Sequence, residues 1–192
     1  MRGFVTRFIL LAAVALTGCA YHFGYSERSL PGGFKEVAIP MFKNETRQVG
    51  AEAYFTEDLV RDFHRSQVAK VVSENVAPIV IEGKITNISY TPEAQIYSTN
   101  QVPDIQLPDN TVLNSSYRVD VSVHIQIRRQ SDQKIIWQGN FDDETAYQAP
   151  LIGLGTINSA DALYDHSARN QVVAQLAKDM MDTAHDRITE NF

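Results

Sequence analysis

The sequence predicts an α+β fold: a small, mostly antiparallel sheet of about four strands, with two helices packed on one face. Two observations support this class. One long segment alternates apolar and polar residues, which is typical of a strand with one buried face. Two other segments repeat apolar residues every three to four positions, which is typical of amphipathic helices. In chain order, the elements read β, α, β, β, β, α.

The first predicted strand, helix and second strand follow one another between two turn-rich stretches. Residues 34–42 (FKEVAIPMF) indicate a strand, which must lie at an edge or an end near Pro40, because proline cannot donate a ladder hydrogen bond. In residues 50–67 the large apolar side chains recur every four positions, and this period predicts a helix. Residues 78–90 (PIVIEGKITNISY) are rich in β-branched side chains and predict the next strand.

A hairpin and a long helix complete the predicted domain. In residues 117–129 apolar side chains alternate without a break with polar ones, which predicts a strand with one buried and one solvated face. After a polar turn, residues 134–144 (KIIWQGNFDDE) predict its hairpin partner. Residues 160–188 predict a helix with a continuous apolar stripe, and Ser159 is a suitable N-cap.

Two segments do not fit a compact element. Residues 91–116 hold three prolines and no glycine, and a loop of that length is usually functional or mobile. Residues 149–157 (APLIGLGTI) place Leu151, Ile152 and Leu154 among turn residues. An apolar loop of this kind either tucks under the domain or contacts a partner. Both possibilities stay open at this point.

The amino-terminal segment has the composition of a secretory signal peptide. Arg2 and Arg7 give a basic start, and an apolar stretch of nine residues follows, which is far shorter than the ~20 residues of a membrane-spanning helix. Cys19 is the only cysteine of the chain, so it has no partner for an internal disulfide. We therefore predict a signal peptide over residues 1–18.

Residues 16–19 (LTGC) resemble the bacterial lipobox. That resemblance implies cleavage before Cys19, a diacylglycerol thioether on its sulfur and an acyl chain such as palmitate on its amine, which together anchor a domain durably to a membrane. Ala20 follows where lipoproteins kept in the inner membrane usually carry Asp, which indicates the outer membrane. An ordinary signal peptide with a stray thiol is the alternative.

Length and charge restrict the classes of function. We expect a short lipidated tether over residues 19–33 and one domain over residues 34–192. Loss of Arg2 and Arg7 with the signal peptide leaves 15 of the 17 basic side chains against 23 acidic ones, a net charge of −8. A chain with this charge is a poor binder of nucleic acid.

The search for catalytic residues gives no candidate. The five histidines lack metal-ligand spacing, and no Gly-x-Ser-x-Gly motif is present. The acidic run 142–144 lacks the spacing of a calcium loop. We therefore expect no catalytic residue, no metal and no cofactor. A periplasmic hydrolase that uses His64 or His124 is a remote alternative.

The stretch LPGGFKEVAIPMFKNET, which follows CAYHFG and precedes YFTEDLVRDFHRS, resembles the LptE family of lipopolysaccharide-assembly lipoproteins. The resemblance is specific over residues 19–66. It implies a sheet with two helices, an outer-membrane location, and a noncatalytic role inside the large LptD β-barrel, where such proteins help lipopolysaccharide to reach the outer leaflet. The implied partners are the barrel, lipopolysaccharide and the membrane, through the lipid on Cys19.

Positive charge gathers on the polar side of the predicted hairpin. Arg118, Arg128 and Arg129, with Lys134 beyond the turn, stand out in an acidic protein. Arginine suits a bidentate grip on phosphate, and a lipid A headgroup carries phosphates. The alternative is that these are ordinary strand-end charges that prevent incorrect pairing of the sheet.

A second class of function shares part of the pattern. A start such as VAIPMFKN after a lipobox also resembles lipoproteins that activate peptidoglycan synthases or form secretion pores. Those proteins are usually larger or carry a long tether. The tether here is barely a dozen residues, and a short tether holds the domain close to its own membrane. The length therefore favours a barrel partner.

Overall fold

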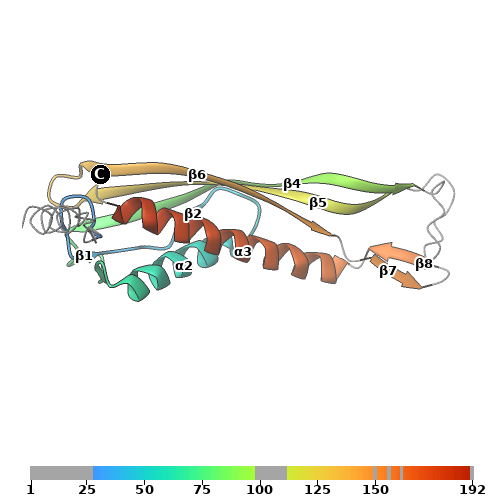
Figure 1. Cartoon of the computed structure of the whole chain (residues 1–192), viewed down its shortest axis with the longest axis horizontal. Coiled ribbons are helices and arrows are strands. Elements are labelled where there is room, and N and C mark those ends of the chain that lie inside the picture. The colour runs from blue at the N-terminus through green and yellow to red at the C-terminus, as the bar shows by residue number, and fades with distance from the viewer. Residues whose placement is uncertain (1–27, 98–111, 149–150, 155–156, 161, 191–192) are drawn as a thin grey trace, which may run out of the picture.

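The computed structural model describes residues 28–97, 112–148, 151–154, 157–160 and 162–190. The predicted signal peptide and Cys19 lie outside this part of the chain. Figure 1 shows a long, twisted sheet with both helices against one of its faces. The elements are β1 (Glu36–Val37), β2 (Lys43–Asn44), α2 (Ala51–Ser66), β3 (Lys70–Val71), β4 (Ile79–Tyr97), β5 (Val112–Arg129), β6 (Ile135–Gln148), β7 (Leu151–Leu154), β8 (Ile157–Ala160) and α3 (Ala162–Thr189).

The main sheet has four strands in the order β2-β4-β5-β6. β4 and β5 pair antiparallel along almost their whole length, from Ile79 opposite Arg129 to Tyr97 opposite Val112. β6 pairs antiparallel with β5, whereas β2 pairs parallel with β4 over two residues. The prediction of a mostly antiparallel four-stranded sheet with two helices on one face is confirmed.

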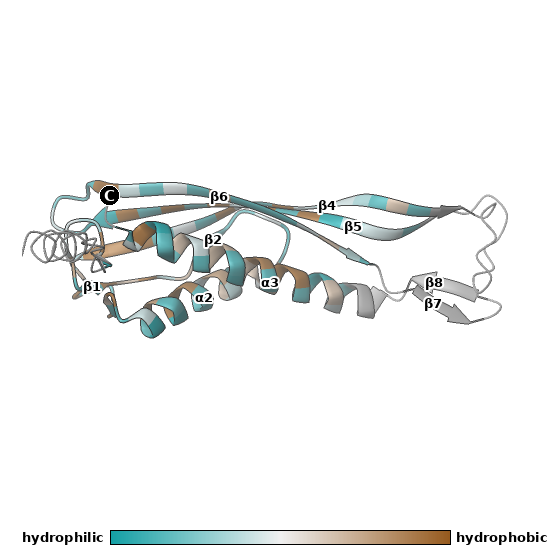
Figure 2. Ribbon diagram, viewed as in Figure 1, coloured by the Kyte–Doolittle hydropathy of each residue, from teal (hydrophilic) through white to brown (hydrophobic). Residues whose placement is uncertain are grey.

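The core lies between the helices and the apolar face of the sheet. Figure 2 shows hydrophilic and hydrophobic residues following one another in short bands along the strands. All five aliphatic residues of the alternating stretch of β5 are buried, and so are the three residues that define the stripe of α2: Val119, Val121, Val123, Ile125, Ile127, Phe55, Leu59 and Phe63. Each such side chain contributes about 1.5–3 kcal/mol when it leaves water. The two sequence periods therefore predicted the faces that meet in the core.

The predicted strand over residues 34–42 is mostly wrong. Only β1 and β2 are strands, and the backbone between them pairs with β4 at a single bridge, from Ala38 to Val80. Pro40 supplies the physical reason, because its nitrogen has no hydrogen to donate to a ladder. β1 pairs instead with β3, and the chain joins the main sheet again only at Lys43.

The predicted loop 91–116 is also corrected. β4 continues to Tyr97 and β5 begins at Val112, so only residues 98–111 fall between the two strands, and these lie outside the described residues. Pro92 is accommodated because β2 pairs with β4 only at Lys84 and Ile85, which leaves Pro92 on the free edge of the sheet. Register shifts on either side of Ala94 accompany it.

The predicted apolar loop 149–157 contains a strand. Leu151, Ile152 and Leu154 belong to β7, which pairs antiparallel with β8. Ser159 lies opposite Ile152 within β8, so it is not the N-cap of the last helix. That helix begins at Ala162. Backbone pairing between β7 and β8 therefore replaces the irregular loop that the turn residues suggested.

An arginine and three tyrosines attach the first half of α3 to the sheet. The guanidinium of Arg169 lies 4.8 Å from the ring centre of Tyr90 and 5.6 Å from that of Tyr117, and its Nε donates to the hydroxyl of Tyr147 at 3.0 Å. The rings of Tyr117 and Tyr147 stack at 5.7 Å. These contacts extend the core beyond α2. Neither helix in the described part of the chain is both long and apolar enough to span a membrane.

Gly83 provides a test of the packing at the edge of the core. A β-carbon on Gly83 would overlap the buried ring of Phe42, which covers β4 at this point. We expect Gly83→Ala to lower the free energy of unfolding by about 1–3 kcal/mol, as overpacking does. Phe42→Leu in the same chain should return part of that loss. Urea denaturation of the four proteins checks this, and additive effects of the two changes would contradict it.

Candidate functional site

The face of the sheet opposite the helices carries polar side chains that bond mainly to one another. On this face Gln126 donates to Glu82 at 2.7 Å, and Ser89 donates to Asp120 at 3.4 Å. The Nδ1 atom of His124 lies 2.7 Å from the amide oxygen of Asn140. These contacts cross from strand to strand, so the polar face is a connected surface.

Arg128 is the least exposed of the four predicted cations. Its guanidinium donates to Glu82 through two nitrogens, and this hydrogen bond holds the pKa of the Glu82 carboxyl below its usual range. Arg129, the next residue along the strand, points to the opposite face and pairs with Asp132 at 3.2 Å. Lys134 has no ion pair among the described residues. A phosphate that binds Arg128 must therefore compete with Glu82.

Arg118 lies in a different region of the same strand. It pairs with Glu93 at 2.7 Å and with Glu144 at 3.5 Å, and all three side chains are largely exposed. Ten residues separate it from Arg128, which corresponds to roughly 33 Å along a strand. The structure therefore does not gather the four cations into one cluster. It places three of them near the β5–β6 turn and one far along the sheet.

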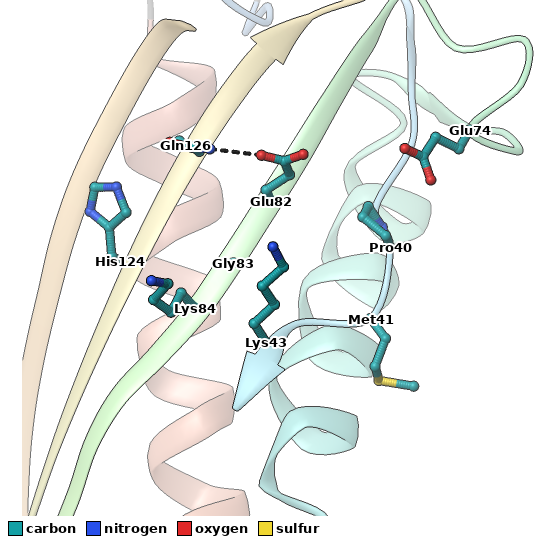
Figure 3. Close-up of a pocket in the computed structure, with 9 residues that line it drawn as sticks. All are labelled: Pro40, Met41, Lys43, Glu74, Glu82, Gly83, Lys84, His124 and Gln126. Carbon is teal, nitrogen blue, oxygen red and sulfur yellow. Dashed lines mark hydrogen bonds between the residues drawn. The ribbon is translucent and has the colours of Figure 1, made fainter. Parts of the chain in front are cut away.

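A shallow pocket of 560 Å³ opens on the polar face beside the chain that leads into β2. Figure 3 shows Lys43 extending toward Glu82, with His124 on the neighbouring strand. Lys84, also in the lining, pairs with Glu45 at 2.9 Å. The charges in this pocket are of both signs, and two of them, Lys84 and Glu82, pair with Glu45 and Arg128 outside the lining. Among the described residues, no group of histidine, cysteine, aspartate and glutamate is suited to hold a metal ion.

A second polar cluster, which the sequence did not indicate, joins α2 to α3. Arg65 contacts Asp62 at 3.0 Å and Asp182 at 2.9 Å. Burial and the neighbouring Asp182 carboxylate raise the pKa of Asp62 to about 6. The sequence position of Asp62 could have indicated its burial, because Asp62 follows Leu59 by three residues on the buried stripe of the helix.

The same cluster contains a serine, a histidine and an aspartate in contact. Ser66 Oγ lies 2.8 Å from His185 Nε2, and His185 Nδ1 lies 3.4 Å from Asp186. Burial lowers the pKa of His185, which favours the neutral ring. Ser66 is the last residue of α2, where backbone carbonyls rather than N–H groups face outward. Such carbonyls disfavour an oxyanion, so this arrangement holds two helices together and does not suit acyl transfer.

The fold and these surfaces define an α+β module whose polar groups bind each other across strands and helices. The family described as "LptE: Lipopolysaccharide-assembly" matches residues 34–189. The chain belongs to this family of lipopolysaccharide-assembly lipoproteins, which are not enzymes.

Solved structures with a similar arrangement come from several bacteria. The PelC dodecamer from Paraburkholderia phytofirmans has a TM-score of 0.49 and 11% identity over 85% of this chain and 95% of that one. A putative lipoprotein from Caulobacter crescentus has a TM-score of 0.46 and 6% identity over 78% and 88% of the two chains. The rare lipoprotein B from Shewanella oneidensis has a TM-score of 0.43 and 11% identity over 77% and 88%. No curated protein matches the sequence.

The cluster at Asp62 makes stability depend on pH. The folded protein keeps the Asp62 proton up to about pH 6, whereas an unfolded chain loses it near pH 3.9. The contribution of Asp62 to stability is therefore present below about pH 4 and is lost as the pH rises through about 6.

Asp62→Asn keeps a hydrogen-bond donor toward Asp182 at every pH. We expect the free energy of unfolding of this variant, relative to the original protein, to rise by about 2 kcal/mol between about pH 4 and pH 7. Urea denaturation at five pH values checks the difference. A constant difference across this range would contradict the assignment.

Proposed function

We propose that this protein is a noncatalytic outer-membrane lipoprotein that plugs the lumen of an LptD-like β-barrel and assists its assembly for lipopolysaccharide transport. The observation that carries the proposal is the family match over residues 34–189. In this proposal residues 1–18 are removed, Cys19 carries the lipid, residues 19–33 form the tether, and residues 34–192 form the domain.

The position of the first described residues supports attachment at one end of the domain. Ser29 donates its backbone N–H to the carbonyl of Thr189 at 3.1 Å, and Arg28 pairs with Asp186 at 2.6 Å. Nine residues span at most about 30 Å between a lipidated Cys19 and Arg28. The end of the molecule that holds the carboxyl terminus of α3 therefore stays near the membrane, and the sheet extends away from it (Figure 1).

The exterior of the domain supports a plug in a water-filled barrel. One face of the sheet is polar over most of its length, and residues 91–95 of β4 are exposed near the point where β6 ends at Gln148. Side chains on this surface can exchange hydrogen bonds with an inner barrel wall. β7, with Leu151, Ile152 and Leu154, is the proposed contact with the barrel or the passing glycolipid.

Glycolipid phosphates are the proposed ligands of the cationic side chains. Arg118 and Lys134 are the more accessible ones, because Arg128 is half-buried against Glu82. A phosphate at Arg118 has only exposed carboxylates to displace. In this proposal Arg128 and Arg129 support the end of the hairpin while contributing positive charge near Lys134.

Purification from native membranes tests the partner. We expect tagged full-length protein in detergent to bring down a large β-barrel in a stoichiometric amount, identified by mass spectrometry. Cys19→Ser should recover several-fold less barrel, because the domain then lacks its anchor. Recovery of a peptidoglycan synthase, or of a ring of this chain without a barrel, would contradict the proposal.

Charge variants test the glycolipid contact. We expect Arg118→Gln and Lys134→Gln each to reduce retention of purified lipopolysaccharide severalfold at low ionic strength, because each removes a phosphate partner. Lys84→Gln is the matched control, since Lys84 is a partly exposed cation on the same face. An equal loss of lipopolysaccharide retention in all three variants would show that only general charge attraction acts, and it would refute the specific site.

A further inference from the structure

β6 is an edge strand of the main sheet, and in the described part of the chain no other strand pairs with its outer side. β6 ends the sheet order, and β5 pairs with its other side from Gln148 to Ile135. In an antiparallel strand the N–H and C=O of one residue point to the same side, and the side alternates along the chain. Half of the backbone groups of β6 therefore point away from the sheet.

Two hydrogen bonds identify which residues these are. The carbonyl of Asn140 accepts from Arg187 of α3 at 3.4 Å, and the N–H of Glu144 is bonded to the carboxylate of Asp143 at 2.9 Å. Both groups point away from β5, so the backbone N–H and C=O groups of the even-numbered residues form the unpaired edge. These residues are Gln138, Asn140, Asp142, Glu144, Ala146 and Gln148. All six are exposed.

A groove runs between this edge and the last turns of α3. It has a volume of 420 Å³, and its strand side includes Asp142 and Asp143, whereas its helix side includes Met180 and Arg187. Phe141 and Met180 are buried core residues that reach its floor. A strand edge beside a helix is the geometry in which extended peptides add to a sheet, with main-chain bonds on one side and side-chain contacts on the other.

The negative charge of the β6 edge indicates which kind of strand could pair with it. Asp142, Asp143 and Glu144 are consecutive, and no ion pair within the described residues engages Asp142 or Asp143. Two copies of β6 paired antiparallel about this run would place carboxylates opposite carboxylates, which is unfavourable. A second copy of this chain is therefore a poor partner. A strand with lysine or arginine at alternate positions is complementary.

We propose that the β6 edge and the β6–α3 groove bind an extended, basic segment of another polypeptide as a fifth strand of the sheet. Asp142 and Asp143 attract its cations, and the outward backbone groups form its ladder. The weak bond from Arg187 to Asn140 opens when the segment binds. The acidic run thus keeps the edge from self-association and leaves it open to a basic strand. This inference goes beyond the barrel proposal and does not require it.

The test uses a defined probe on the full-length protein in detergent. A decapeptide of alternating lysine and valine is titrated, with alternating glutamate and valine as the control peptide. We expect saturable binding of the lysine peptide and slower hydrogen exchange at the Asp142 and Ala146 amides. The glutamate peptide should not bind. Absence of binding by the lysine peptide, or protection elsewhere only, would overturn the proposal.

Three variants distinguish the contribution of backbone hydrogen bonds to peptide binding from that of charge. Asp142→Pro removes an outward N–H without touching the β5 ladder, and it should abolish binding while the Phe141 amide stays protected from exchange. Asp142→Asn with Asp143→Asn should weaken binding about tenfold, consistent with the loss of two charges. The control pair Glu57→Gln with Glu74→Gln, which removes two exposed carboxylates elsewhere, should bind as the original protein does.

Two further outcomes would reject the idea. Unchanged affinity of Asp142→Pro for the lysine peptide would show that the edge is not the binding surface. Concentration-dependent protection of the Asp142 amide in the protein alone would identify a second copy as the occupant, and the heterologous partner would then be wrong.

Discussion

The antiparallel ladder between β4 and β5 determines where every other described part of the main domain lies. It runs from Ile79 opposite Arg129 to Tyr97 opposite Val112, and its two faces differ in polarity except near Val80, which packs with Ala38 and Ala77 on the polar side. Because only one face is apolar, both helices must cover that face, and because the ladder is longer than the helical cover of α2, α3 continues alone beside it (Figure 1). The elongated form of the molecule follows from this mismatch of lengths.

The sequence predicts those parts of the fold in which the residue pattern of one segment alone shows which of its side chains are buried. The alternation in β5 and the four-residue period in α2 each depend only on neighbouring residues, and both predicted correctly which face of the element is buried. The end of β4 was missed because Pro92 reads locally as a loop residue, and only the absence of a neighbouring strand makes it acceptable. Ser159 was misassigned for a similar reason, because its strand depends on pairing with Ile152.

The same distinction explains the candidate site. Arginines and a lysine on a polar strand are visible in the sequence, but their partners are not, because Glu82 and Glu93 come from another strand, 46 and 25 residues before Arg128 and Arg118. The charge that the sequence suggested for ligands is therefore largely engaged within the protein. The β6 edge has the opposite character, since a run of three acidic residues is obvious in sequence but its meaning depends on lying at the end of the sheet.

The contact between Ser29 and Thr189 has a consequence for the order in which the molecule is made. Leu30 is fully buried, and the backbone next to it is bonded to the last turn of α3, 160 residues later in the chain. A polypeptide that emerges from a translocation channel with its amino terminus first cannot complete this contact until its final residues have been released. The sheet can form earlier, through the local β4–β5–β6 pairing. The end of the domain at which Ser29 meets Thr189 is therefore the last to close.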